Sequence, residues 1–240
     1  MENCILLTQV AIIYYMAVRV KTGIPGLDGL IEGGLLQKCV YLVTGETGSG
    51  KTIFVSQFLW NGLLKGETCL FITLEESPEE IKEDVARFGW DLDKFEKKKM
   101  LKIIYHDPAQ VDKLGTLIQN EVVGLKANRL VIDSAAAMSL AIDNKSLIRR
   151  RIASIVSSIK KHEDCTALIT TEVPENSKAL SRFDVEEFVV DGIFVLNYLG
   201  GGNETPRSLT VRKMRRTDHG KDIYPMEINE KGITIKKAGF

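Results

Sequence analysis

The sequence has no net charge and few prolines, and each of these features narrows the class of protein. The 240 residues carry 32 basic and 32 acidic side chains, which argues against a general electrostatic attraction to nucleic acid. Six prolines beside 20 glycines are typical of a sheet-and-helix domain with tight turns. With 44% apolar residues, the chain can bury a sizeable core, and its length suits one domain with room for a small appendage.

The four cysteines have neither metal-ligand nor CxxC spacing, so they predict no zinc site and no redox pair. Cys39 and Cys69 lie in apolar runs, which indicates buried thiols. We therefore expect a reducing, cytoplasmic environment.

An apolar stretch, Ile5–Val18, is too short to span a membrane and lacks the basic flank of a secretory signal. Three interpretations remain open: a buried helix or strand, a segment that binds a membrane surface or a partner, and an extension upstream of a natural start at Met16. We interpret residues 1–19 as an N-terminal extension and residues 20–240 as a single domain. We expect no membrane attachment.

From Val20 onward, predicted strands and helices alternate. The predicted strands are Cys39–Thr44, Thr68–Leu74, Leu101–Tyr105, Arg129–Asp133 and Thr166–Thr171. The predicted helices are Lys51–Lys65, Pro78–Phe88, Lys113–Gly124 and Lys145–Lys161. Apolar strands separated by helices predict an α/β fold with a mainly parallel central sheet flanked by helices. Four short segments then predict a C-terminal antiparallel β extension: Gly192–Leu199, Ser208–Met214, Ile223–Ile228 and Ile233–Lys236.

One glycine-rich stretch, GETGSGKT, has both the sequence and the flanking pattern of a P-loop, because it follows an apolar strand and opens a helix. In a P-loop the glycines let backbone N–H groups close around phosphate oxygens, the lysine reaches the β- and γ-phosphates, and the last hydroxyl binds magnesium. The stretch therefore predicts a site for a nucleoside triphosphate with Mg²⁺. Its candidate ligands are Gly45, Glu46, Thr47, Gly48, Ser49, Gly50, Lys51 and Thr52.

Acidic residues follow two other predicted strands. Asp133 ends RLVIDS, and Glu75 and Glu76 follow LFITL. Ligands of open α/β sheets bind outside the carboxyl ends of the strands. Triphosphate hydrolysis needs an acid near magnesium and a base that orients water. Asp133 is therefore the Walker B candidate and one of the two glutamates is the candidate base; a helix cap for Asp133 and a solvated acidic turn are the ordinary alternatives.

A third strand end carries Thr170, Thr171 and Glu172. The two hydroxyls are placed either to sense a γ-phosphate or to cap the strand end. The sequence leaves both interpretations open.

Several stretches together resemble a single KaiC-type domain of the RecA-like ATPase superfamily. They are TGIPGLDGLIEGGL, GETGSGKT, FITLEESPEEI, FGWDL, VIDS, TTEVPE, SRFDVEEFVVDGI and KMRRTDHGKDIYP, and they extend over residues 20–236. The resemblance implies a RecA-like P-loop core, ATP and Mg²⁺, and a homohexameric ring with nucleotide between protomers. Single-domain relatives of this kind are widespread in archaea.

The resemblance also assigns individual roles. It implies that Glu75 and Glu76 are the catalytic glutamates and that Asp133 holds Mg²⁺ through water. It implies that Lys213 and Arg215 reach the nucleotide of a neighbouring subunit, in trans. Strand alternation agrees, since it places Lys213 and Arg215 on one face and Arg212, Met214 and Arg216 on the other.

Two departures from the family pattern limit what the resemblance implies. Glu187 and Phe188 stand where a related domain has hydroxyl residues that become phosphorylated, so we expect no autokinase activity. Arg216 stands where the family usually has a small residue after the K-x-R pair. The downstream process and any protein partner are not encoded in these motifs.

The main hypothesis is a slow, Mg²⁺-dependent ATPase that hydrolyses ATP between the subunits of a ring, with a regulatory or motor-like output. The alternative is a recombinase-like protein that binds single-stranded DNA through the loop 173–187, which holds Lys178, Arg182 and Phe183. A nucleotide-dependent interaction module without turnover is a third hypothesis.

Overall fold

The computed structural model describes residues 18–140, 142, 144–175, 177, 179–183, 185–198 and 207–238. The apolar extension predicted for residues 1–19 lies outside the described residues up to residue 17. Arg19 is already part of the fold, because β1 (Arg19–Val20) pairs with β2 (Leu35–Leu36). No helix among the described residues is long and apolar enough to cross a membrane.

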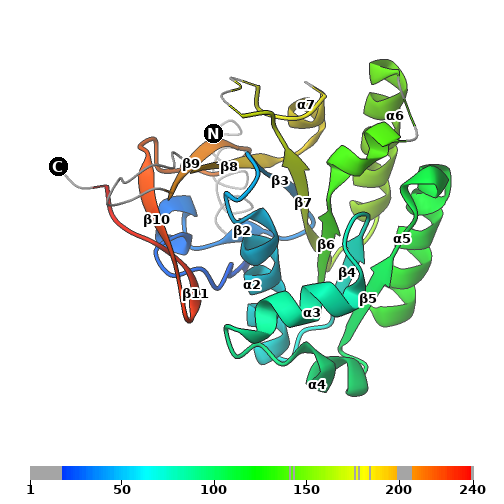
Figure 1. Cartoon of the computed structure of the whole chain (residues 1–240), viewed down its shortest axis with the longest axis horizontal. Helices are drawn as coiled ribbons and strands as arrows, with labels where there is room; N and C mark the ends of the chain where they lie inside the picture. Colours follow the sequence, from blue (N-terminus) through cyan, green and yellow to red (C-terminus); the bar gives the residue numbers. More distant parts are fainter. Residues whose placement is uncertain are drawn as a thin grey trace, which may run out of the picture.

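The described residues form a central sheet of nine strands in the order β11-β10-β9-β8-β3-β7-β6-β4-β5 (Figure 1). Six of them form a parallel core: β3 (Val40–Gly45), β4 (Cys69–Thr73), β5 (Leu101–Tyr105), β6 (Arg129–Asp133), β7 (Thr166–Glu172) and β8 (Gly192–Tyr198). Three antiparallel strands continue the sheet beyond β8: β9 (Arg207–Met214), β10 (Tyr224–Asn229) and β11 (Gly232–Ile235).

Helices cover both faces of the sheet. On one face lie α2 (Lys51–Leu64), α3 (Pro78–Ala86) and α4 (Leu92–Lys97), and on the other lie α5 (Val111–Leu125) and α6 (Lys145–Ile159) (Figure 1). Alternate residues of one strand enter different cores: Tyr41 and Val43 pack on the α2 side, and Val40 and Leu42 pack on the α5–α6 side. Both faces are thus buried, as the apolar strands predict.

The shorter helical elements connect these layers. They are η1 (Asp28–Ile31), η2 (Pro108–Gln110), η3 (Ala135–Leu140) and α7 (Glu186–Val189).

The predicted α/β fold is confirmed, but the antiparallel extension begins one strand later than predicted. β8 pairs in parallel with β3, and antiparallel pairing starts between β8 and β9. Two helices were absent from the prediction, α4 and α7. Asp91 caps the start of α4 by accepting the Lys94 N–H.

A capping box fixes the start of α3 beside the two glutamates of interest. The Ser77 side chain accepts the Glu80 N–H, the Glu80 carboxylate accepts the Ser77 N–H, and Pro78 occupies the first helical position. The Thr73 hydroxyl accepts the N–H groups of Glu75 and Glu76. The acidic loop is therefore held at both of its ends by local hydrogen bonds.

A buried arginine of β6 pairs with Glu67, just after α2, and we expect a large loss of stability when this pair is broken. The Arg129 guanidinium is fully buried, donates to both oxygens of Glu67 and to the Phe58 carbonyl, and lies 4.5 Å from the Phe58 ring centre. We expect Arg129→Ala to lower the free energy of unfolding by about 3–5 kcal/mol, because Glu67 then loses its buried partner. Urea unfolding followed by circular dichroism measures this. Lys102→Ala, which removes the exposed pair with Glu121, is the control and should change stability by less than about 1 kcal/mol; equal effects of the two variants would contradict the assignment.

Candidate functional site

The P-loop lies between β3 and α2, as predicted. Gly48 and Gly50 have φ values of 74° and 98°, which side-chain-bearing residues adopt at a cost in energy. A Cβ at Gly50 would also stand 2.9 Å from Ile228. Both glycines are therefore required by the loop's conformation, which leaves its backbone exposed to a ligand at the N-terminus of a 14-residue helix.

Lys51 is turned into the loop and reaches the end of a neighbouring strand. Its ammonium group donates to the Gly45 and Glu46 carbonyls at 3.2 and 3.0 Å and lies 3.3 Å from the Glu172 carboxylate. The parallel register of β3 and β7 pairs Gly45 with Glu172 and so brings this acid to the P-loop. Glu172 thus holds the lysine that the motif assigns to phosphate.

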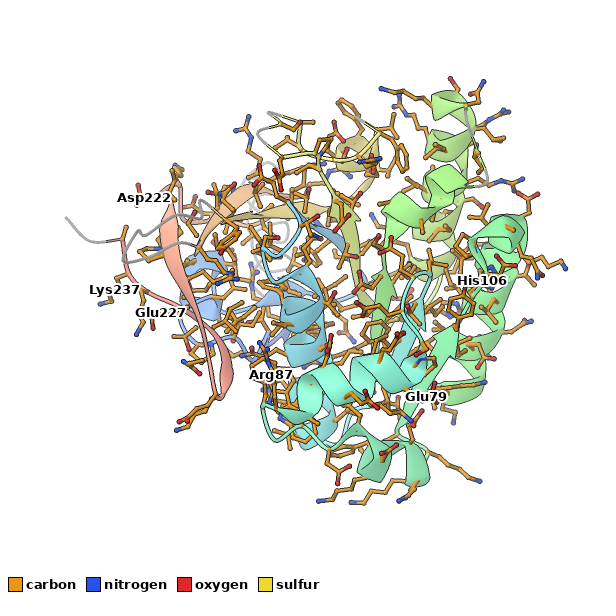
Figure 2. All side chains as sticks on the ribbon, viewed as in Figure 1. Glu79, Arg87, His106, Asp222, Glu227 and Lys237 are labelled. Atoms are coloured by element: carbon orange, nitrogen blue, oxygen red, sulfur yellow. The ribbon has the colours of Figure 1, made fainter. Side chains whose placement is uncertain are left out.

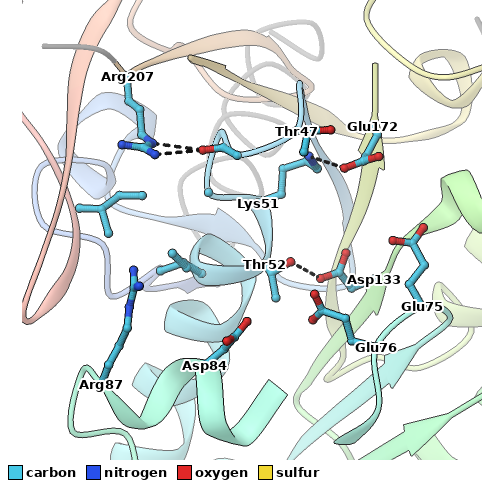
Figure 3. A pocket seen from close by; sticks show the side chains of 14 residues that line it. Thr47, Lys51, Thr52, Glu75, Glu76, Asp84, Arg87, Asp133, Glu172 and Arg207 are labelled. Carbon is cyan, nitrogen blue, oxygen red and sulfur yellow. Dashed lines mark hydrogen bonds and ion pairs between the residues drawn. The ribbon is translucent and has the colours of Figure 1, made fainter. Parts of the chain in front are cut away.

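Asp133 and Thr52, the two residues that the sequence assigns to magnesium, lie in contact. The Thr52 hydroxyl donates to Asp133 Oδ2 at 2.8 Å (Figure 3). The Thr170 hydroxyl donates to Asp133 Oδ1. Burial raises the pKa of Asp133, while these two hydrogen bonds and Lys51 oppose the rise. Hydroxyl and carboxylate oxygens are the ligands that Mg²⁺ takes in phosphate sites, so the donors present fit this ion.

The two glutamates lie beside Asp133 but differ in their contacts. Glu75 accepts a hydrogen bond from the Ser134 hydroxyl at 2.7 Å, whereas no hydrogen bond is found for the Glu76 carboxylate among the described residues. Burial raises the pKa of both, and Asp133 adds to the rise in each case. A carboxyl group with a raised pKa accepts a proton more readily, which is the property required of a base.

These groups line one cavity of about 460 Å³, a size typical of small-molecule sites. Figure 3 shows the carboxylates of Glu75, Glu76, Asp133 and Glu172 on one side of this cavity and the guanidinium groups of Arg87 and Arg207 on the other.

Five lining residues were missed by the sequence analysis: Ile53, Asp84, Arg87, Arg207 and Ile228. Arg207 donates to the Gly48 carbonyl at 3.1 and 3.2 Å and stacks over the Tyr198 ring at 4.4 Å. Arg87 lies where the end of α3 approaches the C-terminal strands (Figure 2). No motif marks these positions.

Lys213 and Arg215 do not line this cavity. They lie beyond the opposite end of the central strands. Gly192 pairs with Tyr41 and with Met214, whereas the P-loop follows Gly45 at the other end of β3. At about 3.3 Å per residue, the strand segment from Tyr41 to Gly45 separates its two ends by about 13 Å. The sequence-predicted site is therefore split: the P-loop, Asp133 and the glutamates come together, and the basic pair stands away from them.

The alternation predicted for β9 holds only in part. Ile193 pairs with Lys213 but Phe194 pairs with Val211, so Arg212 is the extra residue of an irregular pairing. For this reason Arg212 is exposed while Met214, placed on the same face by the sequence analysis, is buried. Arg216 has a φ of 57° and donates to the Cys39 sulfur at 3.1 Å. This left-handed backbone conformation is one that glycine adopts more readily than residues with a Cβ.

Two features proposed from sequence have other roles. The Thr170 and Thr171 hydroxyls are buried and donate to Asp133 and to Glu186, which agrees with the strand-end interpretation. Phe183 is buried, with 6% exposure, so it offers no stacking surface for a nucleic-acid base. Lys178, in the same loop, lies outside the described residues.

Comparison with known proteins agrees with this geometry. The family model of the KaiC ATPase domain matches residues 20–239. A UPF0273 protein of Pyrococcus horikoshii, PH0284, is 34% identical over 237 residues, which cover 92% of this chain and 94% of that protein. The circadian clock protein KaiC3 of Synechocystis is 34% identical over 229 residues, which cover 90% of this chain but 45% of that protein.

A solved structure supports the same relationship. The KaiC-like protein PH0186 of Pyrococcus horikoshii matches with a TM-score of 0.83 and 38% sequence identity, over 92% of this chain and 99% of that one. Its P-loop fold with a mostly parallel sheet and antiparallel C-terminal strands is the architecture found here. The chain therefore belongs to the KaiC family of ATPase domains.

Proposed function

We propose that this protein hydrolyses ATP with Mg²⁺ in a ring of identical subunits, each of which completes the site of its neighbour. Within one chain, the P-loop with Lys51 binds the phosphates, and Thr52 and Asp133 hold the ion, Asp133 through water. Magnesium, when bound, supplies charge stabilisation of the transferring phosphoryl group. Lys213 and Arg215 of the neighbouring subunit approach the γ-phosphate.

The base in this proposal is one of the two glutamates at the end of β4. Both carboxylates line the cavity beside Asp133, and burial raises the pKa of each. Glu75 is partly occupied by the Ser134 hydroxyl, while Glu76 has no such contact among the described residues. Either carboxylate is placed to orient a water molecule for attack, and this proton-accepting step falls to the chain's own residues.

The observation that carries the proposal is the distance between the two halves of the site. The acids and the P-loop share one cavity, while the Lys213–Arg215 pair lies at the opposite end of the strands of the same sheet. A cation held there is too far from its own chain's P-loop to contact a phosphate bound by it. If an identical chain packed against this end of the sheet, the cation would contact the nucleotide of that chain. Because such a site is complete only after assembly, turnover per subunit should be low when the protein is dilute.

The experiment is size-exclusion chromatography with light scattering, with and without ATP and Mg²⁺, combined with turnover measured over a range of protein concentrations. We expect a multimer, with six subunits as the expected number, and turnover per subunit that rises with concentration until assembly is complete. A strict monomer in every state, with turnover independent of concentration, would contradict the proposal.

A further inference from the structure

Asp191 is a buried carboxylate between α7 and β8, at the end of the central strands opposite the P-loop. Only 6% of its side chain is exposed. Its Oδ2 accepts the Val40 N–H at 3.0 Å, and its own N–H donates to the Val40 carbonyl at 2.7 Å. These bonds fix Asp191 to the start of β3, so its carboxylate is a rigid point among longer and more flexible side chains.

Two basic side chains share this carboxylate unequally. The Lys160 ammonium lies 2.7 Å from Oδ2 and 2.8 Å from Oδ1, whereas Arg215 Nη1 lies 3.7 Å from Oδ1. The backbone N–H of Arg215 also donates to the backbone carbonyl of Asp191 at 2.8 Å. Lys160 therefore balances most of the charge of Asp191, and Arg215 is oriented without being fully paired. Consistently, 49% of the Arg215 side chain remains exposed.

The carbonyl groups around α7 hold the other contacts of the basic pair. Lys213 donates to the Glu187 and Val190 carbonyls at 2.8 Å each, and Arg215 donates to the Phe188 carbonyl at 3.3 Å. Burial and the nearby Arg215 lower the pKa of Lys213, and Asp191 opposes this. The two cations thus lie close together, and Asp191 is an acid that offsets their mutual repulsion.

We propose that Asp191 is a positioning residue. It keeps the Arg215 side chain directed away from its own sheet, toward the nucleotide of a neighbouring subunit, while Lys160 balances the charge of Asp191. The inference rests on the proposed function, because it requires Arg215 to act in trans. Asp191 is not among the residues that line the described nucleotide cavity, so its effect passes through Arg215 and leaves the chain's own P-loop unchanged.

A double-mutant cycle with Arg215→Ala tests the inference. Asp191→Asn keeps the shape and the acceptor for Val40 but removes the charge. We expect kcat for ATP to fall about 10- to 100-fold, the loss typical of a misplaced catalytic group, with KM and the Kd for a fluorescent ATP analogue unchanged. In the Arg215→Ala background, Asp191→Asn should cause no further loss, because the group it positions is gone.

Two controls separate positioning from general damage. Asp112→Asn removes an exposed acid that pairs with Arg151 on α5–α6, and it should leave kcat unchanged. Lys160→Met leaves the backbone bonds of Asp191 intact and serves if Asp191→Asn fails to fold. It should also lower kcat, because Arg215 then becomes the nearest cation to the buried carboxylate and is drawn inward.

The outcomes distinguish this inference from the proposed function. If Arg215→Ala is slow but Asp191→Asn and Lys160→Met match the wild type, only the positioning role is overturned. An equal loss from Asp191→Asn in both backgrounds overturns it too, since the effect then does not pass through Arg215. If Arg215→Ala itself has wild-type turnover, the proposed function fails and this inference fails with it.

Discussion

Replacing Arg215 with alanine should lower kcat for ATP hydrolysis by about 10³- to 10⁵-fold, the range that arginine fingers supply in phosphoryl transfer. The physical reason is that, in the proposed mechanism, the guanidinium would stabilise charge on the γ-phosphate only in the transition state. Binding of ATP to the P-loop should be unaffected, because Arg215 lies at the end of the strands opposite the P-loop of its own chain. Steady-state kinetics together with direct nucleotide binding measure the two effects separately.

The matched control for this change is Arg212→Ala, which removes an exposed arginine from the irregular pairing of the same strand. It should keep wild-type turnover and the wild-type oligomer. Light scattering must show that the Arg215→Ala protein is still assembled. Unchanged turnover in an assembled Arg215→Ala protein would remove the arginine from the mechanism.

The second large effect concerns the glutamate pair. The double variant Glu75→Gln/Glu76→Gln should lower kcat by about 10²- to 10⁴-fold, the usual contribution of a general base, without weakening ATP binding. The two single variants identify the base, since only one of them should approach the double variant. Glu79→Gln, an exposed acid in the first turn of α3, is the control and should have wild-type turnover.

The pH dependence provides an independent reading of the same pair. Burial raises the pKa of both glutamates, and a base must be deprotonated to act. Activity should therefore fall, as the pH is lowered, at a higher pH than for an ordinary glutamate. Glu75 is one cause of the raised pKa of Glu76. If Glu76 is the base, Glu75→Gln should shift this acid limb to lower pH; if kcat is lost instead, Glu75 is the base.

The parts of the candidate site whose positions could be predicted from sequence are those that one local motif encodes. GETGSGKT defines the loop, the lysine and the hydroxyl assigned to magnesium within eight residues, and Asp133 is recognisable because it ends a continuous apolar strand. The fold followed from the same feature, since the apolar strands alternate with helices of amphipathic spacing. Such signals need no knowledge of which strands are neighbours.

The parts that could not be predicted depend on register between distant segments. Glu172 reaches Lys51 only because β3 and β7 pair with Gly45 opposite it, and Arg207 reaches Gly48 only because β9 runs antiparallel to β8. The helix α7 has four residues, too few to show a helical period. The pairing irregularity at Arg212 likewise breaks the period of two on which strand predictions depend.

The central claim is that one subunit's arginine completes another subunit's site, and mixing two inactive proteins tests it directly. Arg215→Ala keeps an intact pocket, and Glu75→Gln/Glu76→Gln keeps an intact basic pair, so each is nearly inactive alone. In a mixed ring, about a quarter of the interfaces should join a wild-type pocket to a wild-type arginine by random pairing. We predict that mixing the two after dissociation restores turnover to a comparable fraction of the wild-type value. Turnover that stays at the sum of the two separate proteins, in rings shown to contain both, would contradict the account.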